Sequence, residues 1–297
     1  MEQSRKEWRF TAMDSVTTDF SSQPVVEPPA GGPAWGGRTR IMGILNVTPD
    51  SFFDGGRNNL PAAAETRARV MDAEGADWID IGAESSRPGA TLISKDEELR
   101  RLLPVIERVR LVTRLPLSVD TTKAAVAKAA LAAGATWIND IWGLQGDPGM
   151  ADVVAEAQAS VVIMHNQRGA EYPDGIFTAI GRFFEVSLQL AGRAGIPHSR
   201  VVLDPGIGFG KTPAQNLEVL RGLAEFKGFG LPLLLGASRK SVIGHVLRLP
   251  PEERLEGSLV TTVAAVAAGF DAVRVHDVQA HVRVARTADA IYRISHG

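Results

Sequence analysis

The spacing of apolar residues after Arg40 constrains the fold of this 297-residue chain more than any other feature. Short apolar or β-branched runs alternate with longer stretches that carry the period of amphipathic helices. Near-continuous apolar strands separated by helices are typical of a parallel sheet covered by helices. Eight such units in about 250 residues fit one closed (β/α)8 barrel, or TIM barrel, better than an open doubly wound sheet. The sequence therefore predicts an α/β protein built as a single TIM barrel.

The repeating units can be placed along the chain. The expected strands are Ile41–Val47, Trp78–Gly82, Leu117–Asp120, Trp137–Asp140, Val161–His165, Val201–Asp204, Leu233–Gly236 and Ala272–His276. The expected helices are Ala62–Glu74, Asp96–Val112, Lys123–Ala133, Met150–Ala157, Ala179–Ala194, Pro213–Phe226, Arg254–Ala268 and Val278–Ile294. The barrel is accordingly expected to occupy residues 39–297.

Residues 1–38 have a different composition, rich in Ser, Thr, Gln, Pro and Gly, and show no strand or helix period. Such a segment buries too little apolar surface to offset the entropy lost on ordering. We expect a flexible, disordered extension that Trp35 attaches to the barrel, and the sequence indicates no role for it.

Polar residues occur where each expected strand ends. They are Asn46, Glu84, Asp120, Asn139, Asp140, His165, Asp204, Ser238, Arg239, Lys240, Arg274, His276 and Asp277. Enzymes with this fold carry their chemistry at the carboxyl ends of the strands. Any one of these residues alone is typical of a hydrogen-bonded strand end, but their recurrence on all eight strands predicts a single site.

Asp120, Asn139 and Asp204 follow apolar strands, so we expect them deep in the mouth of the barrel. A buried carboxylate needs a donor. A ligand with an amidine-like edge, such as a 2-amino-4-oxo pteridine or a purine, offers parallel N–H groups to a carboxylate. The alternative for each aspartate is a structural ion pair with Lys240 or Arg274.

Arg87, Lys240, Arg274 and His276 form a cationic group beside Asn46. Such a group favours a phosphate or diphosphate. The amide oxygen of Asn46 suits a single protein ligand to Mg²⁺, which usually takes its other ligands from waters and substrate phosphates. The alternative for His276 is a hydrogen-bonded residue at the barrel end.

Three loops complete the expected site. Residues 46–61 include Asp50, and residues 82–90 include Ser86, Arg87 and Pro88; glycines and prolines at their edges are typical of mobile lids. The segment Gly206–Thr212 resembles a P-loop but has Pro205 where the first glycine is needed. It is better read as a rigid loop against the ligand, with Phe209 available to stack.

Composition excludes several other classes of protein. The chain has no cysteine, so disulfides, thiolate zinc sites, iron–sulfur clusters and cysteine nucleophiles are excluded. A net charge of −2 argues against a dedicated nucleic-acid binder. No apolar run has the length of a membrane span or a signal peptide, so we expect no membrane partner and a cytoplasmic location.

Eight motifs, in order, resemble the dihydropteroate synthases. They are MGILNVTPDSF at Met42–Phe52, ESSRPGA at Glu84–Ala90, SVDTTK at Ser118–Lys123, INDI at Ile138–Ile141, MH at Met164–His165, LDPGIGFGKT at Leu203–Thr212, GASRKSVIG at Gly236–Gly244 and RVHD at Arg274–Asp277. The first, sixth and seventh are highly specific. The resemblance covers essentially everything after residue 40.

The resemblance implies a folate-biosynthesis enzyme, an alkyl/aryl transferase that joins (7,8-dihydropterin-6-yl)methyl diphosphate to 4-aminobenzoate. It also implies Mg²⁺, a homodimer and a sulfonamide target. By position, the pterin residues are Asp120, Asn139, Met164, Asp204, Gly236 and Lys240. The diphosphate residues are Asn46, Arg87, Arg274 and His276, with Asn46 also the Mg²⁺ ligand. The 4-aminobenzoate residues are Ser86, Pro88, Phe209 and Ser241, and the implied catalytic residues are Asp50, Arg87 and Lys240.

The chain departs from the commonest family pattern at three places. Phe53 replaces a frequent serine, Ser86 replaces threonine but keeps the hydroxyl, and Asn166-Gln167-Arg168 replaces Met-Gln-Gly or Met-Arg-Gly. None removes a charged group that the chemistry needs. The effect of Phe53 and of residues 166–168, the oligomeric state, kinetic constants and sulfonamide sensitivity do not follow from the sequence.

The mechanism expected from these residues is a dissociative alkyl transfer. Mg²⁺ and the cations stabilise the leaving diphosphate, the carboxylates favour the pterin methylene cation, and the neutral arylamine attacks without a strong base. Asp50 is expected to shield the cation from water. The alternatives are a methyltetrahydrofolate–corrinoid methyltransferase, which needs neither the Ser-Arg-Pro loop nor Ser238–Ser241, and a silent binding paralogue, which would have lost Asn46, the lid loops or the cations.

Overall fold

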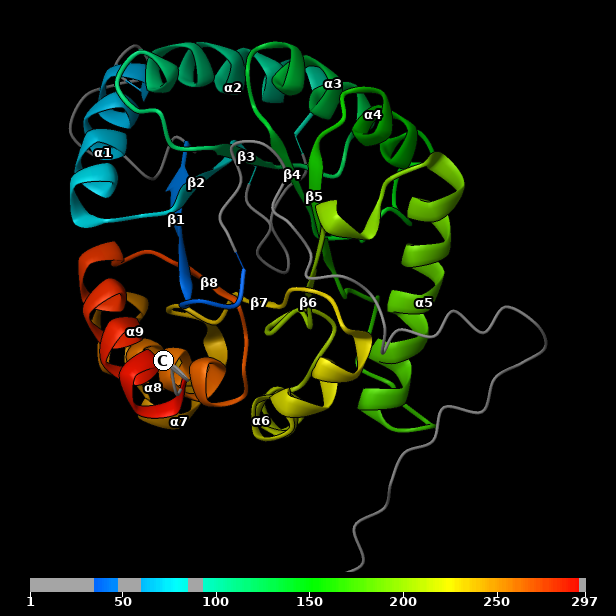
Figure 1. The fold of residues 1–297 in the computed structure, drawn as a ribbon, viewed down its shortest axis with the longest axis vertical. Coiled ribbons are helices and arrows are strands. Elements are labelled where there is room, and N and C mark those ends of the chain that lie inside the picture. Colours follow the sequence, from blue (N-terminus) through cyan, green and yellow to red (C-terminus); the bar gives the residue numbers. More distant parts are fainter. Residues whose placement is uncertain (1–34, 48–59, 85–92, 294–297) are drawn as a thin grey trace, which may run out of the picture.

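In the computed structural model, residues 35–47, 60–84 and 93–293 are described, and they form the predicted barrel. Eight parallel strands alternate with helices, which form an outer ring in Figure 1. The strands are β1 (Arg40–Asn46), β2 (Trp78–Gly82), β3 (Leu117–Asp120), β4 (Trp137–Asp140), β5 (Ser160–Met164), β6 (Val201–Asp204), β7 (Leu234–Leu235) and β8 (Ala272–Val275). All eight expected strands are confirmed.

The sheet closes on itself, because its strand order is β6-β5-β4-β3-β2-β1-β8-β7 and a parallel bridge from Leu203 to Leu233 joins β6 to the start of β7. This closing seam is short, since β7 has only two residues. The backbone N–H of Leu203 donates to the carbonyl of Pro232 across the seam, 2.9 Å apart.

The helices of the ring mostly match the expected ranges. They are α1 (Leu60–Glu74), α2 (Lys95–Arg110), α3 (Ala124–Ala132), α4 (Met150–Glu156), α5 (Ile176–Ala194), α6 (Pro213–Arg221), α7 (Ser241–Leu247), α8 (Leu255–Ala267) and α9 (Val278–Tyr292). None of the described helices is long and apolar enough to cross a membrane.

Two local differences from the predicted helices have physical causes. The stretch expected as one helix from Pro213 to Phe226 is divided, because α6 ends at Arg221 with Gly222 as its C-cap, and a 3-10 helix, η4 (Leu223–Phe229), follows. Glycine is a poor residue for a helix interior. The short helix α7 was not expected, since its sequence SVIGHVL contains glycine and β-branched residues that disfavour helices.

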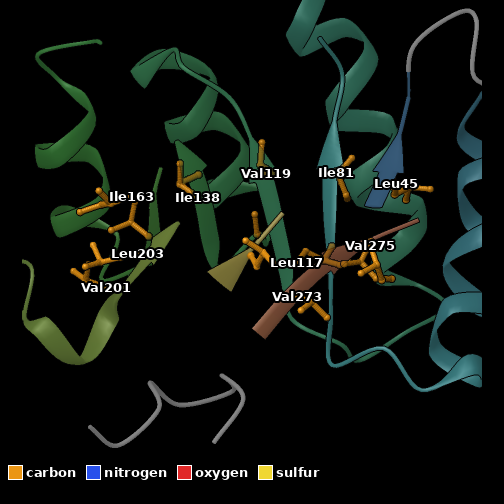
Figure 2. Packing of buried hydrophobic residues seen from close by; sticks show 14 of the residues in the cluster. Leu45, Ile81, Leu117, Val119, Ile138, Ile163, Val201, Leu203, Val273 and Val275 are labelled. Carbon is orange, nitrogen blue, oxygen red and sulfur yellow. The ribbon is translucent and has the colours of Figure 1, made fainter. Parts of the chain in front are cut away.

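Alternate residues of each strand face opposite sides of the sheet. The outward side chains pack under the helices as the main core (Figure 2), and they include Leu45, Ile81, Leu117, Val119, Ile138, Ile163, Val201, Leu203, Val273 and Val275. The inward side chains near the strand starts form a second apolar cluster, consisting of Met42, Trp78, Trp137, Val162, Val202, Leu234 and Ala272. This inner cluster fills the amino end of the barrel.

Trp35 contacts the inner cluster, as the sequence predicts. Its ring lies edge-on to Trp78 and Trp137, with centroids 6.2 Å away in each case, while Trp78 and Trp137 stack at 5.8 Å. The extension predicted for residues 1–38 otherwise falls outside the described residues, apart from 35–38, so its flexibility and its boundary stay predictions.

Candidate active site

Most inward side chains beyond the apolar inner cluster are polar, and Ile44 and Met164 are the apolar exceptions among the described strands. Strand pairing places Asn46 beside Gly82, Gly82 beside Asp120, and Asp120 beside Asn139. Asp80, Asp204 and Arg274 have the same inward parity on β2, β6 and β8. The carboxyl end of the barrel therefore gathers the predicted residues Asn46, Asp120, Asn139, Asp204 and Arg274 around one mouth.

Arg274 is the centre of a buried network of ions. Its Nε donates to Asp80 at 2.6 Å, and its Nη2 donates to Asp120 at 2.9 Å. The amide nitrogen of Asn139 also donates to Asp80, at 3.0 Å. The predicted alternative of a structural ion pair thus holds for Asp120, and Arg274 lies among the carboxylates rather than in a separate cationic group.

Burial sets the electrostatics of this network. It raises the pKa of Asp120 to about 7, with Arg274 opposing the rise and Asp80 adding to it. Burial also raises the pKa of Asp204. For Arg274 burial acts against the charge, but Asp80 and Asp120 outweigh it and raise the pKa further. The site thus holds carboxyls that gain from any additional N–H donor.

Asp204 differs from Asp120 because no arginine pairs with it among the described residues. Its Oδ1 accepts the backbone N–H of Gly206 at 2.7 Å. Its Oδ2 faces Gly236, where an added Cβ would lie 3.2 Å from this oxygen and 3.7 Å from Nζ of Lys240. The lack of a side chain at position 236 keeps that edge of the carboxylate open.

Lys240 lies over the loop that follows β6. Its Nζ donates to the carbonyl of Ile207 at 2.6 Å and stands 4.6 Å from the ring centroid of Phe209. Burial lowers the pKa of Lys240 to about 8, and Asp204 opposes that change. The structure therefore brings the predicted residues Asp204, Phe209, Gly236 and Lys240 together.

Comparison with known proteins agrees with this arrangement of side chains. The family described as pterin binding enzyme matches residues 42–276, which include every inward polar residue of the mouth. The dihydropteroate synthase of Bacillus subtilis is 49% identical over 254 residues, covering 86% of this chain and 89% of the relative. The chain belongs to the dihydropteroate synthase family. It is accordingly a transferase of folate biosynthesis.

Solved dihydropteroate synthases have the same barrel. The enzyme from Clostridium difficile, crystallised with pteroic acid, superposes with a TM-score of 0.86 at 52% identity, covering 88% of this chain and 99% of that one. The enzyme from Xanthomonas albilineans with 4-aminobenzoic acid gives a TM-score of 0.83 at 44% identity, covering 86% and 94%.

Three other residues expected at the dihydropteroate synthase site end β5 or follow β7 and β8. His276 follows β8, and its Nδ1 is 3.0 Å from the hydroxyl of Ser238. Met164, the last residue of β5, is buried and pairs with Asp204. Ser241 begins α7 and is exposed.

Several strand-end residues have structural roles instead. Asp140 accepts the backbone N–H groups of Trp142 and Leu144 and so caps a turn. Arg239 forms a paired hydrogen bond with Asp277. The recurrence of polar residues at strand ends therefore overestimates the site.

Asp50, Phe53, Ser86, Arg87 and Pro88 lie outside the described residues. The residues that flank the second loop are described. Glu84 accepts the backbone N–H of Ile93 at 2.6 Å and pairs with Lys123 at 2.8 Å. Lys123 also pairs with the fully buried Glu98 at 2.6 Å. These contacts join the two ends of residues 84–93.

Asp80, in the buried network, and Lys211, on the loop after β6, are two residues that the sequence reasoning did not single out. Asp80 is fully buried in the middle of the apolar run WIDIG. A carboxylate two residues before the end of an apolar strand faces the same side of the sheet as the last residue, which here is the inside of the barrel. This position in the sequence could have identified Asp80. Lys211 was part of the rejected P-loop motif and received no role.

Proposed function

We propose that this dihydropteroate synthase condenses (7,8-dihydropterin-6-yl)methyl diphosphate with 4-aminobenzoate to give 7,8-dihydropteroate and diphosphate. The observation that carries the proposal is the open edge of the buried Asp204 carboxylate above Gly236. A carboxylate with a raised pKa and a free oxygen gains from the parallel N–H donors of a pterin. Pteroic acid and 4-aminobenzoic acid in relatives' structures support the same substrates.

The pterin would lie across the mouth between β3 and β7. Asp204 and Asp120 would accept its N–H groups, and the amide of Asn139 would complete the polar edge. Lys240 would donate to the ring from the side of β7, and Met164 would pack against the ring. Because the carboxyls are buried, they bind such donors more strongly than exposed ones would.

The diphosphate would lie on the side of β1 and β8. Arg274 already uses Nε and Nη2 on Asp80 and Asp120, but a guanidinium has five N–H groups, so others stay available to an anion. His276 and Asn46 border the same side. Arg87 is proposed here from the family pattern.

The donor set fits Mg²⁺ held mainly by its substrate. Among the described residues, no group of three acidic or histidine side chains could hold a metal ion. Asn46 Oδ1 lies on the mouth side, since an added Cβ at Gly82 would be 3.8 Å from it and 3.9 Å from Asp120 Oδ2. One neutral oxygen beside substrate phosphates is a common Mg²⁺ arrangement. When bound, the ion would neutralise charge on the leaving diphosphate.

We propose a dissociative order of bond changes. The bond from the pterin methylene carbon to the diphosphate oxygen breaks first, and its electron pair leaves with the diphosphate, which Arg87, Arg274 and His276 stabilise. Asp120 and Asp204 stabilise the positive charge left on the pterin. The neutral amine of 4-aminobenzoate then forms the new carbon–nitrogen bond, and the proton that its nitrogen loses passes to the released diphosphate or to water.

The 4-aminobenzoate would lie between Phe209 and the loop after β2. Ser86, Pro88 and Phe209 would border its ring, and Ser241 at the start of α7 would face its carboxylate. Sulfonamides would compete there. Asp50 is proposed to keep water from the methylene cation.

The test is a diphosphate-release assay with purified protein. Release should require the dihydropterin diphosphate, 4-aminobenzoate and Mg²⁺ together. A corrinoid methyltransferase would release no diphosphate, and a silent pterin binder would retain ligand without turnover. Diphosphate release at the same rate with and without 4-aminobenzoate would contradict the proposed reaction.

The open edge of Asp204 leads to a prediction for Gly236. In Gly236→Ala the added methyl would lie 3.2 Å from the Asp204 carboxylate and would crowd the pterin. We expect kcat/KM for the dihydropterin diphosphate to fall about tenfold or more, because small misplacements at a reacting centre are costly. Gly228→Ala is the control, since an added Cβ there meets nothing within 4 Å. Equal kcat/KM values for the two variants would show that Gly236 does not border the pterin.

The pKa values predict a narrow optimum in pH. Below about 7 Asp120 takes up a proton and stops accepting from the pterin, and above about 8 Lys240 loses its charge. We therefore expect a bell-shaped profile of kcat/KM for the dihydropterin diphosphate, with its maximum between these values. The measurement is initial rates at constant ionic strength; a flat profile from pH 6 to 9 would contradict it.

We also propose the homodimer and the cytoplasmic location that the resemblance and the sequence imply. Val246 and Leu247 on α7 and Val260 on the adjacent α8 are exposed apolar residues that a second copy would cover. Light scattering should give twice the chain mass, and Val260→Glu should shift the protein towards a monomer. A monomer from the unmodified chain would contradict the proposal.

A further inference from the structure

Lys211, which has no role in the reaction proposed above, uses all the donors of its ammonium group inside the protein. Its Nζ donates to the carbonyl oxygens of Gly206 and Phe209 at 2.9 and 3.1 Å, and it contacts Nδ1 of His165 at 2.8 Å. A lysine ammonium has three N–H groups. Burial lowers the pKa of Lys211 to about 7, and Asp204 opposes that change. In its charged form Lys211 therefore has no donor left for a substrate.

His165 is the acceptor that completes this set. It is 1% exposed, and burial followed by the nearby Lys211 charge lowers its pKa, so the ring is neutral. A neutral imidazole accepts at one nitrogen. Its backbone N–H donates to the carbonyl of Asp204 at 2.9 Å. His165 thus fixes Lys211 to the ends of β5 and β6.

The loop held by Lys211 has little freedom elsewhere. Gly206 has a φ of +69°, and an added Cβ there would overlap the carbonyl oxygen of His165. The backbone N–H of Gly208 donates to Asn216 Oδ1 at 2.7 Å. Nζ of Lys240 donates to the carbonyl of Ile207, which lies along the chain between the two carbonyls that Lys211 binds. Two lysines thus bind three carbonyls of one loop, those of Gly206, Ile207 and Phe209.

We propose that Lys211 is a positioning residue that sets the place of Phe209 and hence the affinity for 4-aminobenzoate. This inference rests on the proposed function. Phe209 is the aromatic wall assigned to the arylamine, and its carbonyl is one of the three groups that Lys211 binds. The same wall contacts the Lys240 ammonium. Without the Lys211 ammonium, the carbonyls of Gly206 and Phe209 lose their shared donor and the wall can move.

The experiment is steady-state kinetics on Lys211→Met, with Lys128→Met as the control. Lys128 is an exposed lysine on α3, and its one ion pair within the described part of the chain is with Glu156, at 3.8 Å. In Lys211→Met we expect KM for 4-aminobenzoate to rise about tenfold, while kcat and KM for the dihydropterin diphosphate change less than about threefold. Lys211→Arg, which keeps the charge, should recover part of the affinity for 4-aminobenzoate and serves as the test if Lys211→Met does not fold.

A double-mutant cycle with Phe209→Ala identifies the route of the effect. If Lys211 acts through Phe209, KM for 4-aminobenzoate in the double variant should not exceed that of the more impaired single variant. Additive losses, or equal losses for both substrates, would overturn the proposal. The proposed function is tested separately, since the unmodified enzyme and Lys128→Met must release diphosphate only with both substrates. If they do not, the proposed function is wrong, independently of the result for the Lys211 variants.

Discussion

Replacing Asp204 with asparagine is expected to lower kcat/KM for the dihydropterin diphosphate about a thousandfold. Asparagine keeps the shape and the hydrogen bond from the Gly206 backbone N–H, but it removes the negative charge at the open edge and beside Lys240. A charged hydrogen bond contributes roughly 1.5–3 kcal/mol. The loss of two such bonds therefore amounts to about 4 kcal/mol, or about three powers of ten.

The measurement is diphosphate release at low substrate concentration, with circular dichroism to check the fold. Asp152→Asn on the exposed face of α4 is the matched control and should keep full activity. Asp204→Asn should also stop binding pterin in the absence of 4-aminobenzoate. Activity within tenfold of the unmodified enzyme would mean that Asp204 does not hold the pterin.

Replacing Arg274 with methionine is expected to destabilise the protein by about 3–5 kcal/mol at pH 8, because buried carboxylates lose their cation. Arg274 is the partner of both Asp80 and Asp120, and Asp80 is fully buried. For a barrel of this size the midpoint of thermal unfolding should fall by about 10 °C. Activity should be lost as well, since the diphosphate loses a ligand.

The instability should depend on pH in a definite direction. The folded pKa of Asp120 already exceeds its unfolded value, and removing Arg274 raises it further. Between the unfolded and the folded pKa of Asp120, the folded state binds more protons than the unfolded state. The free energy of unfolding therefore decreases as pH rises through this range. The variant should therefore be less impaired at pH 5 than at pH 8, as measured by urea unfolding. Arg283→Met, on α9, is the control; an equal deficit at both pH values would contradict the role of Asp120.

The fold was predictable because each strand is a short, nearly continuous apolar run. Val201–Asp204 and Trp78–Gly82 match their expected ranges. The least regular unit was the seventh, where Leu234 and Leu235 alone form the strand and the short helix α7 begins at Ser241. Short elements with glycine and β-branched residues give too weak a pattern for sequence reasoning to detect.

The site was predictable to the extent that its residues end strands. Asp120, Asn139 and Asp204 do so, and the mouth of the barrel brings them together. The expected separation of deep carboxylates from a cationic group does not hold for Arg274, which pairs with Asp120. Burial explains the difference, because unpaired ions inside a protein are costly. The partner of a buried charge depends on the three-dimensional arrangement, which residue spacing does not give.

The packing of Trp35 on Trp78 and Trp137 gives the molecule an optical signal of its own. Indole rings this close couple electronically, and three of the five tryptophans lie at the end of the barrel opposite the substrates. Near-ultraviolet circular dichroism should therefore follow the docking of residue 35 onto the barrel while remaining insensitive to ligands in the mouth. Fluorescence studies of substrate binding need to allow for this large, ligand-independent background.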